Sequence, residues 1–336
     1  MSKKAIEIQF NWIFVLIAGT AILIFFTVLV VKQKNLSESS TKAVVLKSME
    51  SIISGASTTI DTTKIENLPN INIEIGCNKI SIGNLQKQYQ NLILFGPKLV
   101  KGKGFVWQTS AFSMPYRSTN LLYLTSPQLK YIITGINDLV KEVNKSMPVY
   151  LDKELYASYQ TALQIKDSNN YKIRFLIFDS INLVGNSVPL AVAKMKDEEV
   201  SALKIEGDAE KGTLEFYQKK GNSWNLLGTS AYIGKSALLG AVYADNLEAY
   251  DCNMQNTFGR LKLVTDVYYE RTKKLRDTVQ RQECRQIYNN ALNQINSIKS
   301  LSSSFRPENV NNMVSTSKLL SVQNKEAQKF SCPLIY

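Results

Sequence analysis

The longest run of apolar positions lies near the N-terminus. Residues 10–31 form 22 consecutive positions without a charged side chain. At about 1.5 Å per residue, a helix of this length covers about 33 Å and matches a hydrocarbon core about 30 Å thick. Trp12 lies at one end, and Lys32 and Lys34 close the other, as interfacial and snorkelling residues do. We predict a transmembrane helix over residues 10–31, in contact with membrane lipid, after an N-terminal tail over residues 1–9.

An amphipathic pattern follows the apolar run. Apolar residues recur at helical spacing from Val45 to Ile53, and a polar stretch that contains Pro69 comes next. We therefore expect residues 32–70 to form an amphipathic helix that continues from the membrane, and then an irregular linker over residues 57–70.

Alternating and mixed patterns fill the middle of the chain. Ile73 and Ile75 alternate with polar residues, as do Ile80 and Ile82, which predicts a hairpin. Further strands are expected over residues 92–95, 105–108, 121–124, 131–134, 171–178, 200–205 and 212–217, and helices over residues 137–144 and 152–165. This order predicts an α/β or α+β domain over residues 71–235, with a partly parallel sheet covered by helices.

Helical periodicity dominates the last hundred residues. Steps of three and four join apolar residues from Tyr243 to Tyr268, from Cys284 to Ile298 and from Val314 to Val322. We expect a helical region over residues 236–336, with three helices arranged up-down-up and turns near Arg276 and Pro307.

This bundle restricts how the four cysteines can pair. They are Cys77, Cys252, Cys284 and Cys332. With a turn near Arg276, Cys252 and Cys284 differ in level by about 24 Å at about 1.5 Å per residue, whereas a disulfide needs Cα atoms within about 7 Å. Cys332 returns to the level of Cys284. We predict the disulfides Cys284–Cys332 and Cys77–Cys252, with unpaired thiols as the alternative.

The net charge of +12 is densest in residues 270–285. This run contains Arg271, Lys273, Lys274, Arg276, Arg281 and Arg285, interrupted by Glu270, Asp277 and Glu283. Such a mixture is typical of a solvated helix surface. Contact with anionic lipid or an acidic surface polymer is the second interpretation, a protein partner is a further one, and nucleic acid is the least favoured.

The residue types limit the chemistry. The chain contains no histidine, which excludes Ser-His and Cys-His nucleophile pairs and every metal site that uses histidine. The cysteines are too scattered for a zinc or thioredoxin motif. We therefore predict no catalytic, cofactor-binding or metal-binding residue and no enzyme. An enzyme would require a concave pocket lined by converging carboxylates.

One segment resembles a phosphate-binding P-loop. Gly228 to Ser236 has five residues before Gly234-Lys235-Ser236, whereas the loop requires four. The acidic strand that ends at Asp179 also precedes this segment, where P-loop proteins usually place it afterwards. We interpret residues 228–236 as a plain turn before a helix.

Orientation rests on two opposing features. More lysines follow the apolar helix than precede it, which favours a cytoplasmic domain. A short tail followed at once by an anchor is instead the layout of a chain that sends its C-terminal mass outward, and large domains translocate regardless of nearby charge. We expect a single-pass protein of the cell membrane whose C-terminal domain is extracellular.

Three segments carry a resemblance to other proteins. Residues 7–19, Tyr123-Leu-Thr-Ser-Pro127 and Tyr243-Ala-Asp-Asn246 resemble a group of uncharacterised single-span proteins of small-genome archaea. The resemblance implies an archaeal envelope setting and no particular activity.

Two functions are compatible with these sequence features. The favoured one is a non-enzymatic envelope protein whose exterior domain binds a partner or organises the cell surface. The alternative is a pilin-like subunit of a surface filament, because an apolar helix that continues into an amphipathic one resembles a pilin stem. Lys3-Lys4-Ala5 before Ile6 resembles a prepilin cleavage site, although Glu7 departs from that pattern.

Overall fold

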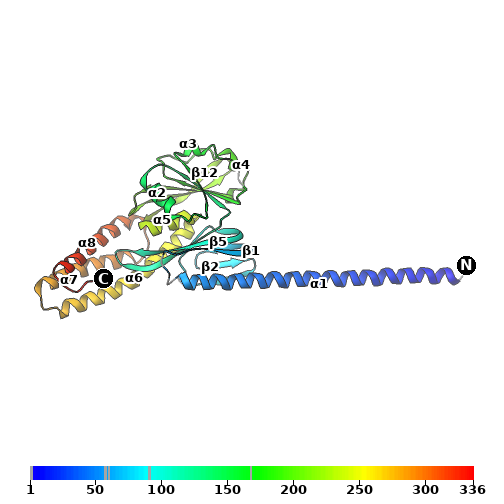
Figure 1. The fold of residues 1–336 in the computed structure, drawn as a ribbon, viewed down its shortest axis with the longest axis horizontal. Helices are drawn as coiled ribbons and strands as arrows, with labels where there is room; N and C mark the ends of the chain where they lie inside the picture. The colour runs from blue at the N-terminus through cyan, green and yellow to red at the C-terminus, as the bar shows by residue number, and fades with distance from the viewer. Residues whose placement is uncertain (1–2, 57–58, 60, 90–91, 167–168) are drawn as a thin grey trace. The chain divides into compact units, whose positions relative to one another are not determined.

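A computed structural model describes residues 3–56, 59, 61–89, 92–166 and 169–336. Figure 1 shows its helices and strands. The chain divides into an N-terminal unit, residues 1–49, and a C-terminal unit, residues 50–336. Both sheets and the C-terminal helices belong to the C-terminal unit, so the expected boundary at residue 235 lies inside one unit.

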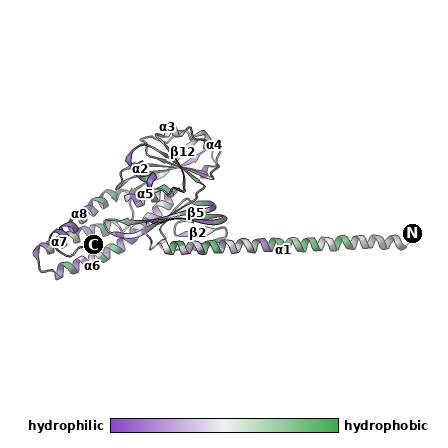
Figure 2. Ribbon diagram, in the orientation of Figure 1, coloured by the Kyte–Doolittle hydropathy of each residue, from purple (hydrophilic) through white to green (hydrophobic). Residues whose placement is uncertain are grey.

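The apolar run forms part of helix α1, Lys3–Ala56, which is 54 residues long. Within the described residues, α1 is the one helix that is long and apolar enough to cross a membrane. Its most apolar window has a mean hydropathy of 2.5, and none of it is buried within the protein. Figure 2 shows the apolar residues along this helix. α1 continues without a break through the segment expected to be amphipathic.

The first sheet has six strands in the order β3-β2-β1-β5-β6-β4. The strands are β1 (Thr63–Gly76), β2 (Lys79–Ile82), β3 (Leu85–Gln88), β4 (Leu94–Phe95), β5 (Leu99–Ser113) and β6 (Arg117–Thr125). The predicted hairpin is confirmed, because Ile75 of β1 pairs with Ile80 of β2. The expected linker over residues 57–70 is wrong from Thr63 onward. β1 pairs there with the distant β5, beginning at Gln108, and supplies a partner that the local pattern does not reveal.

The second sheet has the order β12-β11-β10-β9-β7-β8. Its strands are β7 (Leu129–Thr134), β8 (Asp152–Tyr156), β9 (Lys172–Ile177), β10 (Val200–Gly207), β11 (Lys211–Lys220) and β12 (Ser223–Ile233). β7 to β10 run parallel, and β11 and β12 are antiparallel additions. The prediction of a partly parallel sheet in a mixed α/β fold is therefore confirmed.

Short helices connect the parallel strands. They are α2 (Asp138–Ser146), α3 (Tyr159–Ala162), α4 (Leu190–Ala193) and the 3-10 helix η1 (Asp197–Glu199). From β7 the chain adds β8 on one side and then β9 and β10 on the other side, as in doubly wound sheets. Because this changes the direction of the connections, the connecting helices cover both faces of the sheet. The helix expected over residues 152–165 is wrong. Residues 152–156 pair along β7, and only one turn of helix follows.

The C-terminal region contains the helices α5 (Gly234–Tyr243), α6 (Leu247–Thr278), α7 (Gln282–Leu301) and α8 (Val310–Lys329), with the 3-10 helix η2 (Pro307–Asn309) before α8. The three long helices confirm the predicted helical region, and α7 packs against both α6 and α8. The first long helix begins at Leu247 rather than Tyr243. Asn246 caps it by accepting a hydrogen bond from the Ala249 N–H, so α5 and α6 are separate helices.

Strand β9 shows how the two faces of the second sheet are used. Ile173, Phe175 and Ile177 pack in a core with residues of α3 and α4. Leu176 packs in the larger core, which joins both sheets to α5 and the long helices. This division follows from the alternation of side chains along a strand.

Both predicted cysteine pairings are present. Cys77 pairs with Cys252, and Cys284 pairs with Cys332, with Cα separations of 5.9 and 5.8 Å. The first disulfide joins the β1–β2 turn to α6. The second joins the start of α7 to the segment after α8.

Candidate functional site

A cleft of about 720 Å³ lies between the two sheets. Its walls come from β1 and the start of β5 in the first sheet, the amino end of β9, η1 with the residue before it, β11 and β12, and the junction of α5 with α6. The apolar part of the wall consists of Leu99, Tyr171, Leu227 and Leu247. The other lining residues are charged or polar, so the cleft combines an apolar wall with a charged floor and rim.

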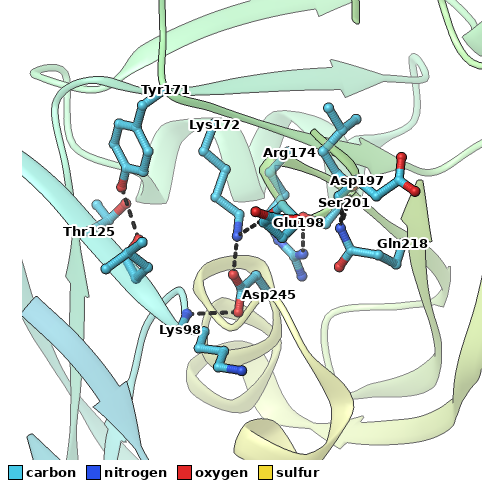
Figure 3. A network of polar contacts seen from close by, with 12 residues as sticks. Lys98, Thr125, Tyr171, Lys172, Arg174, Asp197, Glu198, Ser201, Gln218 and Asp245 are labelled. Carbon is cyan, nitrogen blue, oxygen red and sulfur yellow. Dashed lines mark hydrogen bonds and ion pairs between the residues drawn. The ribbon is translucent and has the colours of Figure 1, made fainter. Parts of the chain in front are cut away.

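An ion pair between Lys172 and Asp245 forms the floor of the cleft (Figure 3). The two residues are 5% and 4% exposed. The Lys172 ammonium also donates to the Glu198 carbonyl at 3.1 Å, and Asp245 Oδ1 accepts from the Lys98 backbone N–H at 2.8 Å. Each charge is thus compensated by a partner and a backbone group, as a buried ion pair requires.

Arg174 lies beside this floor and is completely buried. Its guanidinium donates to the Val242 and Ala241 carbonyls at 2.8 Å each and to Ser201 Oγ at 3.0 Å. Burial lowers the pKa of Arg174 to about 10, so the side chain stays protonated at neutral pH. It supplies donors to carbonyls at the end of α5 and fixes the position of the α5–α6 junction that carries Asp245.

Tyr171 forms an aromatic part of the wall. Its hydroxyl donates to the Leu99 carbonyl at 3.2 Å, and burial raises its pKa to about 12. The Lys101 ammonium lies 5.8 Å from the ring centroid. Tyr171 is therefore neutral near pH 7 and connects β9 with β5 across the cleft.

The rim of the cleft carries charges of both signs. The cationic residues are Lys98, Lys101 and Lys196, and the acidic residues are Glu74, Glu198, Glu199 and Glu248. Within the described part of the chain, none of these seven side chains takes part in a salt bridge. The cleft can therefore bind a molecule that has apolar surface and both positive and negative groups.

The same groups bear on possible chemistry. Carboxylates do line a concave site, which is the arrangement expected of an enzyme, but the buried one, Asp245, is held by Lys172 and the Lys98 N–H. Both of its carboxylate oxygens are therefore engaged by groups of the protein. Among the residues that the structure describes, no group of three or more acidic or cysteine side chains could hold a metal ion.

The structure separates the features singled out from the sequence. The disulfide Cys77–Cys252 joins the two elements that carry Glu74 and Glu248 into the cleft wall. Cys284–Cys332 lies elsewhere, at the end of α8.

The segment that resembles a P-loop does not form a loop. Residues 228–233 belong to β12, and α5 begins at Gly234, whose φ of +72° allows the direct change from strand to helix. Asp179 accepts a hydrogen bond from the Tyr159 N–H at the start of α3.

The floor residues were missed in the sequence. A signal was present, because Lys172 and Arg174 interrupt a strand that is otherwise apolar from Tyr171 to Phe178. Cationic residues inside a buried strand require partners. The partners, Asp245 and the end of α5, lie about 70 residues away in the chain, and no local pattern indicates them.

Comparison with known proteins gives no assignment. No protein-family model matches the chain, and no curated protein or solved structure matches it. The function has to be inferred from the residues themselves.

Proposed function

We propose that this chain is a single-span protein of the cell envelope whose C-terminal unit lies outside the cell and binds a ligand or partner in the cleft. The observation that carries the proposal is the pairing of all four cysteines in a chain with an exposed apolar helix. Disulfides persist in oxidising compartments and are rare in the cytosol.

The apolar helix supports the membrane part of the proposal. α1 has the length and composition of a membrane span, and its most apolar window is not buried within the protein. An apolar helix that the protein leaves unburied is unfavourable in water, because burial of each Leu, Ile or Phe side chain gains about 1.5–3 kcal/mol. Lipid is the environment that suits it.

The cleft supports the binding part of the proposal. Its apolar wall can take up nonpolar surface of a ligand. The lysines and glutamates of the rim, which form no salt bridge among the described residues, can orient charged groups. A short peptide segment with charges of both signs has this chemistry. The buried floor pair keeps the shape of the site fixed, which lowers the entropic cost of binding.

The proposal can be tested on intact cells that carry the full chain with an N-terminal and a C-terminal tag. Externally added protease should remove the C-terminal tag and leave the N-terminal tag protected. Peptide mapping without reductant should show Cys77 joined to Cys252 and Cys284 joined to Cys332. Protection of the C-terminal tag together with free thiols would refute the exterior location.

A second function, a pilin-like subunit, is favoured by one observation. α1 is uninterrupted over 54 residues, so the apolar and amphipathic segments form one stem. Mass spectrometry of the mature N-terminus distinguishes the two proposals. Loss of the first five residues would favour the pilin-like subunit, and an intact N-terminus would favour the permanent anchor.

A further inference from the structure

A second surface lies away from the cleft, where α6 turns into α7. Arg281 donates to the Phe330 carbonyl at 2.8 Å, and Arg271 donates to the Leu334 carbonyl at 3.1 Å. The disulfide Cys284–Cys332 joins the same segments. Residues 270–285 and 325–334 therefore form one surface, which we call the basic tip.

The basic tip concentrates positive charge. It contains eight cationic side chains against four acidic ones. The cationic residues are Arg271, Lys273, Lys274, Arg276, Arg281, Arg285, Lys325 and Lys329, and all except Arg276 are exposed. In the folded chain Lys325 and Lys329 lie on the same surface as residues 270–285, so the tertiary structure increases the density of positive charge there.

Most of this charge is not neutralised. In the described part of the chain, the only ion pair of the basic tip joins Arg276 and Asp277. Arg271 and Arg281 bind backbone carbonyls, and Arg285 donates to the Val279 carbonyl at 3.1 Å. A carbonyl holds a guanidinium in place but leaves its full charge and its other N–H groups available.

Helix stability does not account for all of these cations. Arg281 is the N-cap of α7, and Arg285 lies in its first turn. Positive charge at a helix N-terminus opposes the helix dipole and costs about 0.3–1 kcal/mol per residue. Glu283 supplies the acidic residue of this turn, so the helix dipole does not account for Arg281 and Arg285 beside it.

The position of the basic tip bears on what it contacts. Glu50, where the C-terminal unit begins, pairs with Lys87 of β3 at 2.5 Å. β3 belongs to the strands that Cys77 joins to Cys252 near the start of α6. Thr278 lies 26 residues further along α6, which is about 39 Å at about 1.5 Å per residue. The basic tip thus lies far, within this unit, from Glu50, where the chain enters it.

We propose that the basic tip binds an acidic polysaccharide of the cell surface through its guanidinium and ammonium groups. Arginine matches carboxylate geometry with two parallel hydrogen bonds, and a polymer that repeats carboxylates can contact several of these cations at once. The inference deepens the proposed function, because it names a partner class for an exterior unit. It rests on that function only for the location.

Binding of fluorescent polygalacturonate to the purified full-length chain in mild detergent tests the inference. The variant Lys273→Glu with Lys274→Glu should weaken binding about tenfold or more. It should also make the plot of log affinity against log salt less steep by about 1 to 2, because fewer counterions are released. Both side chains are exposed and outside any ion pair of the described chain, so circular dichroism should be unchanged.

A matched control makes the same charge change at two exposed lysines of the second sheet's connecting helices, which form no ion pair among the described residues. Lys145→Glu with Lys194→Glu should leave binding within about twofold. Equal loss in this control would overturn the inference, because net charge alone would then drive binding. Tighter binding of the wild type to vesicles of anionic lipid or to single-stranded DNA than to polygalacturonate would also overturn it. If the C-terminal domain is exterior in cells but does not bind the polysaccharide, only the proposal for the basic tip is refuted. If the domain is protected from protease but binds the polysaccharide, only the exterior location is refuted.

Discussion

At the scale of single residues, the ion pair between Lys172 and Asp245 joins elements that line the cleft. The two residues connect β9 with the α5–α6 junction, and the backbone N–H of Lys98, the residue before β5, donates to Asp245. A buried ion pair adds little net stability over an apolar pair of the same size, but removal of one partner leaves a buried charge without compensation.

We therefore expect Lys172→Met to lower the free energy of unfolding by about 3–5 kcal/mol. The double variant Lys172→Met with Asp245→Leu should recover a large part of this loss, because no charge remains buried. Urea unfolding of the full-length protein in mild detergent measures both. A single variant within about 0.5 kcal/mol of the wild type would show that water reaches the pair.

Asp251, near the start of α6, makes the free energy of unfolding depend on pH. Burial raises its pKa above the ordinary value, and Ser230 Oγ, which donates to Asp251 Oδ1 at 2.7 Å, opposes that rise. A carboxyl group with a raised folded pKa holds its proton more tightly in the folded state. Its charge therefore opposes folding above that pKa, and this cost fades as the pH falls through it.

We expect Asp251→Asn to stabilise the protein at pH 7, by less than about 1 kcal/mol because solvent screens a partly exposed group. The amide oxygen can still accept from Ser230. The gain should vanish below about pH 4, where the aspartate is protonated in both states. Thermal unfolding at pH 7 and pH 4 provides the measurement, and a gain that is the same at both pH values would contradict this account.

At the scale of elements, Arg174 determines how α5 ends. Its guanidinium donates hydrogen bonds to two carbonyls of α5 and to a hydroxyl of β10, so a side chain of β9 caps the C-terminus of the helix. The next residues turn away and begin α6 at Leu247. The continuous helix that periodicity predicts from Tyr243 is interrupted at this point.

We expect Arg174→Lys to destabilise the protein by about 2–4 kcal/mol, although the positive charge is retained. An ammonium cannot reach all three acceptors, so at least one buried carbonyl loses its donor. Hydrogen exchange of the Ala244 amide, which donates to the Gly240 carbonyl at 2.9 Å, should accelerate. The exposed Arg306→Lys serves as a control and should change neither quantity. Unchanged exchange in Arg174→Lys would show that α5 ends without this cap.

At the scale of the whole molecule, the two disulfides differ in loop length and in access. Cys77–Cys252 closes 175 residues and Cys284–Cys332 closes 48. Loop entropy gives stabilisations of about 5 and about 4 kcal/mol. Cys77 is exposed, whereas Cys284 and Cys332 are 1% and 6% exposed.

We expect a mild reductant to open Cys77–Cys252 first, because thiolate attack requires access to a sulfur atom. Alkylation followed by mass spectrometry should detect labelled Cys77 and Cys252 while the other pair is intact. Unfolding by urea should then require less denaturant. Simultaneous labelling of all four cysteines would mean that the bundle opens as readily as the β1–β2 turn.

The sequence by itself determined the features that depend on neighbours along the chain. The apolar helix through residues 10–31, the hairpin around Cys77, the periodicity of the long helices and the basic run at residues 270–285 all follow from local patterns. Even the cysteine pairing could be predicted, because helix rise fixes the levels of Cys252 and Cys284.

Tertiary structure alone decided the features that depend on distant partners. Residues 63–70 and 152–156 became strands because β5 and β7 offer them hydrogen-bonding edges. The cleft floor joins Lys172 to Asp245 across 73 residues. Backbone pairing and charge compensation are satisfied wherever the fold brings the groups together, so the positions of these partners cannot be obtained from local periodicity.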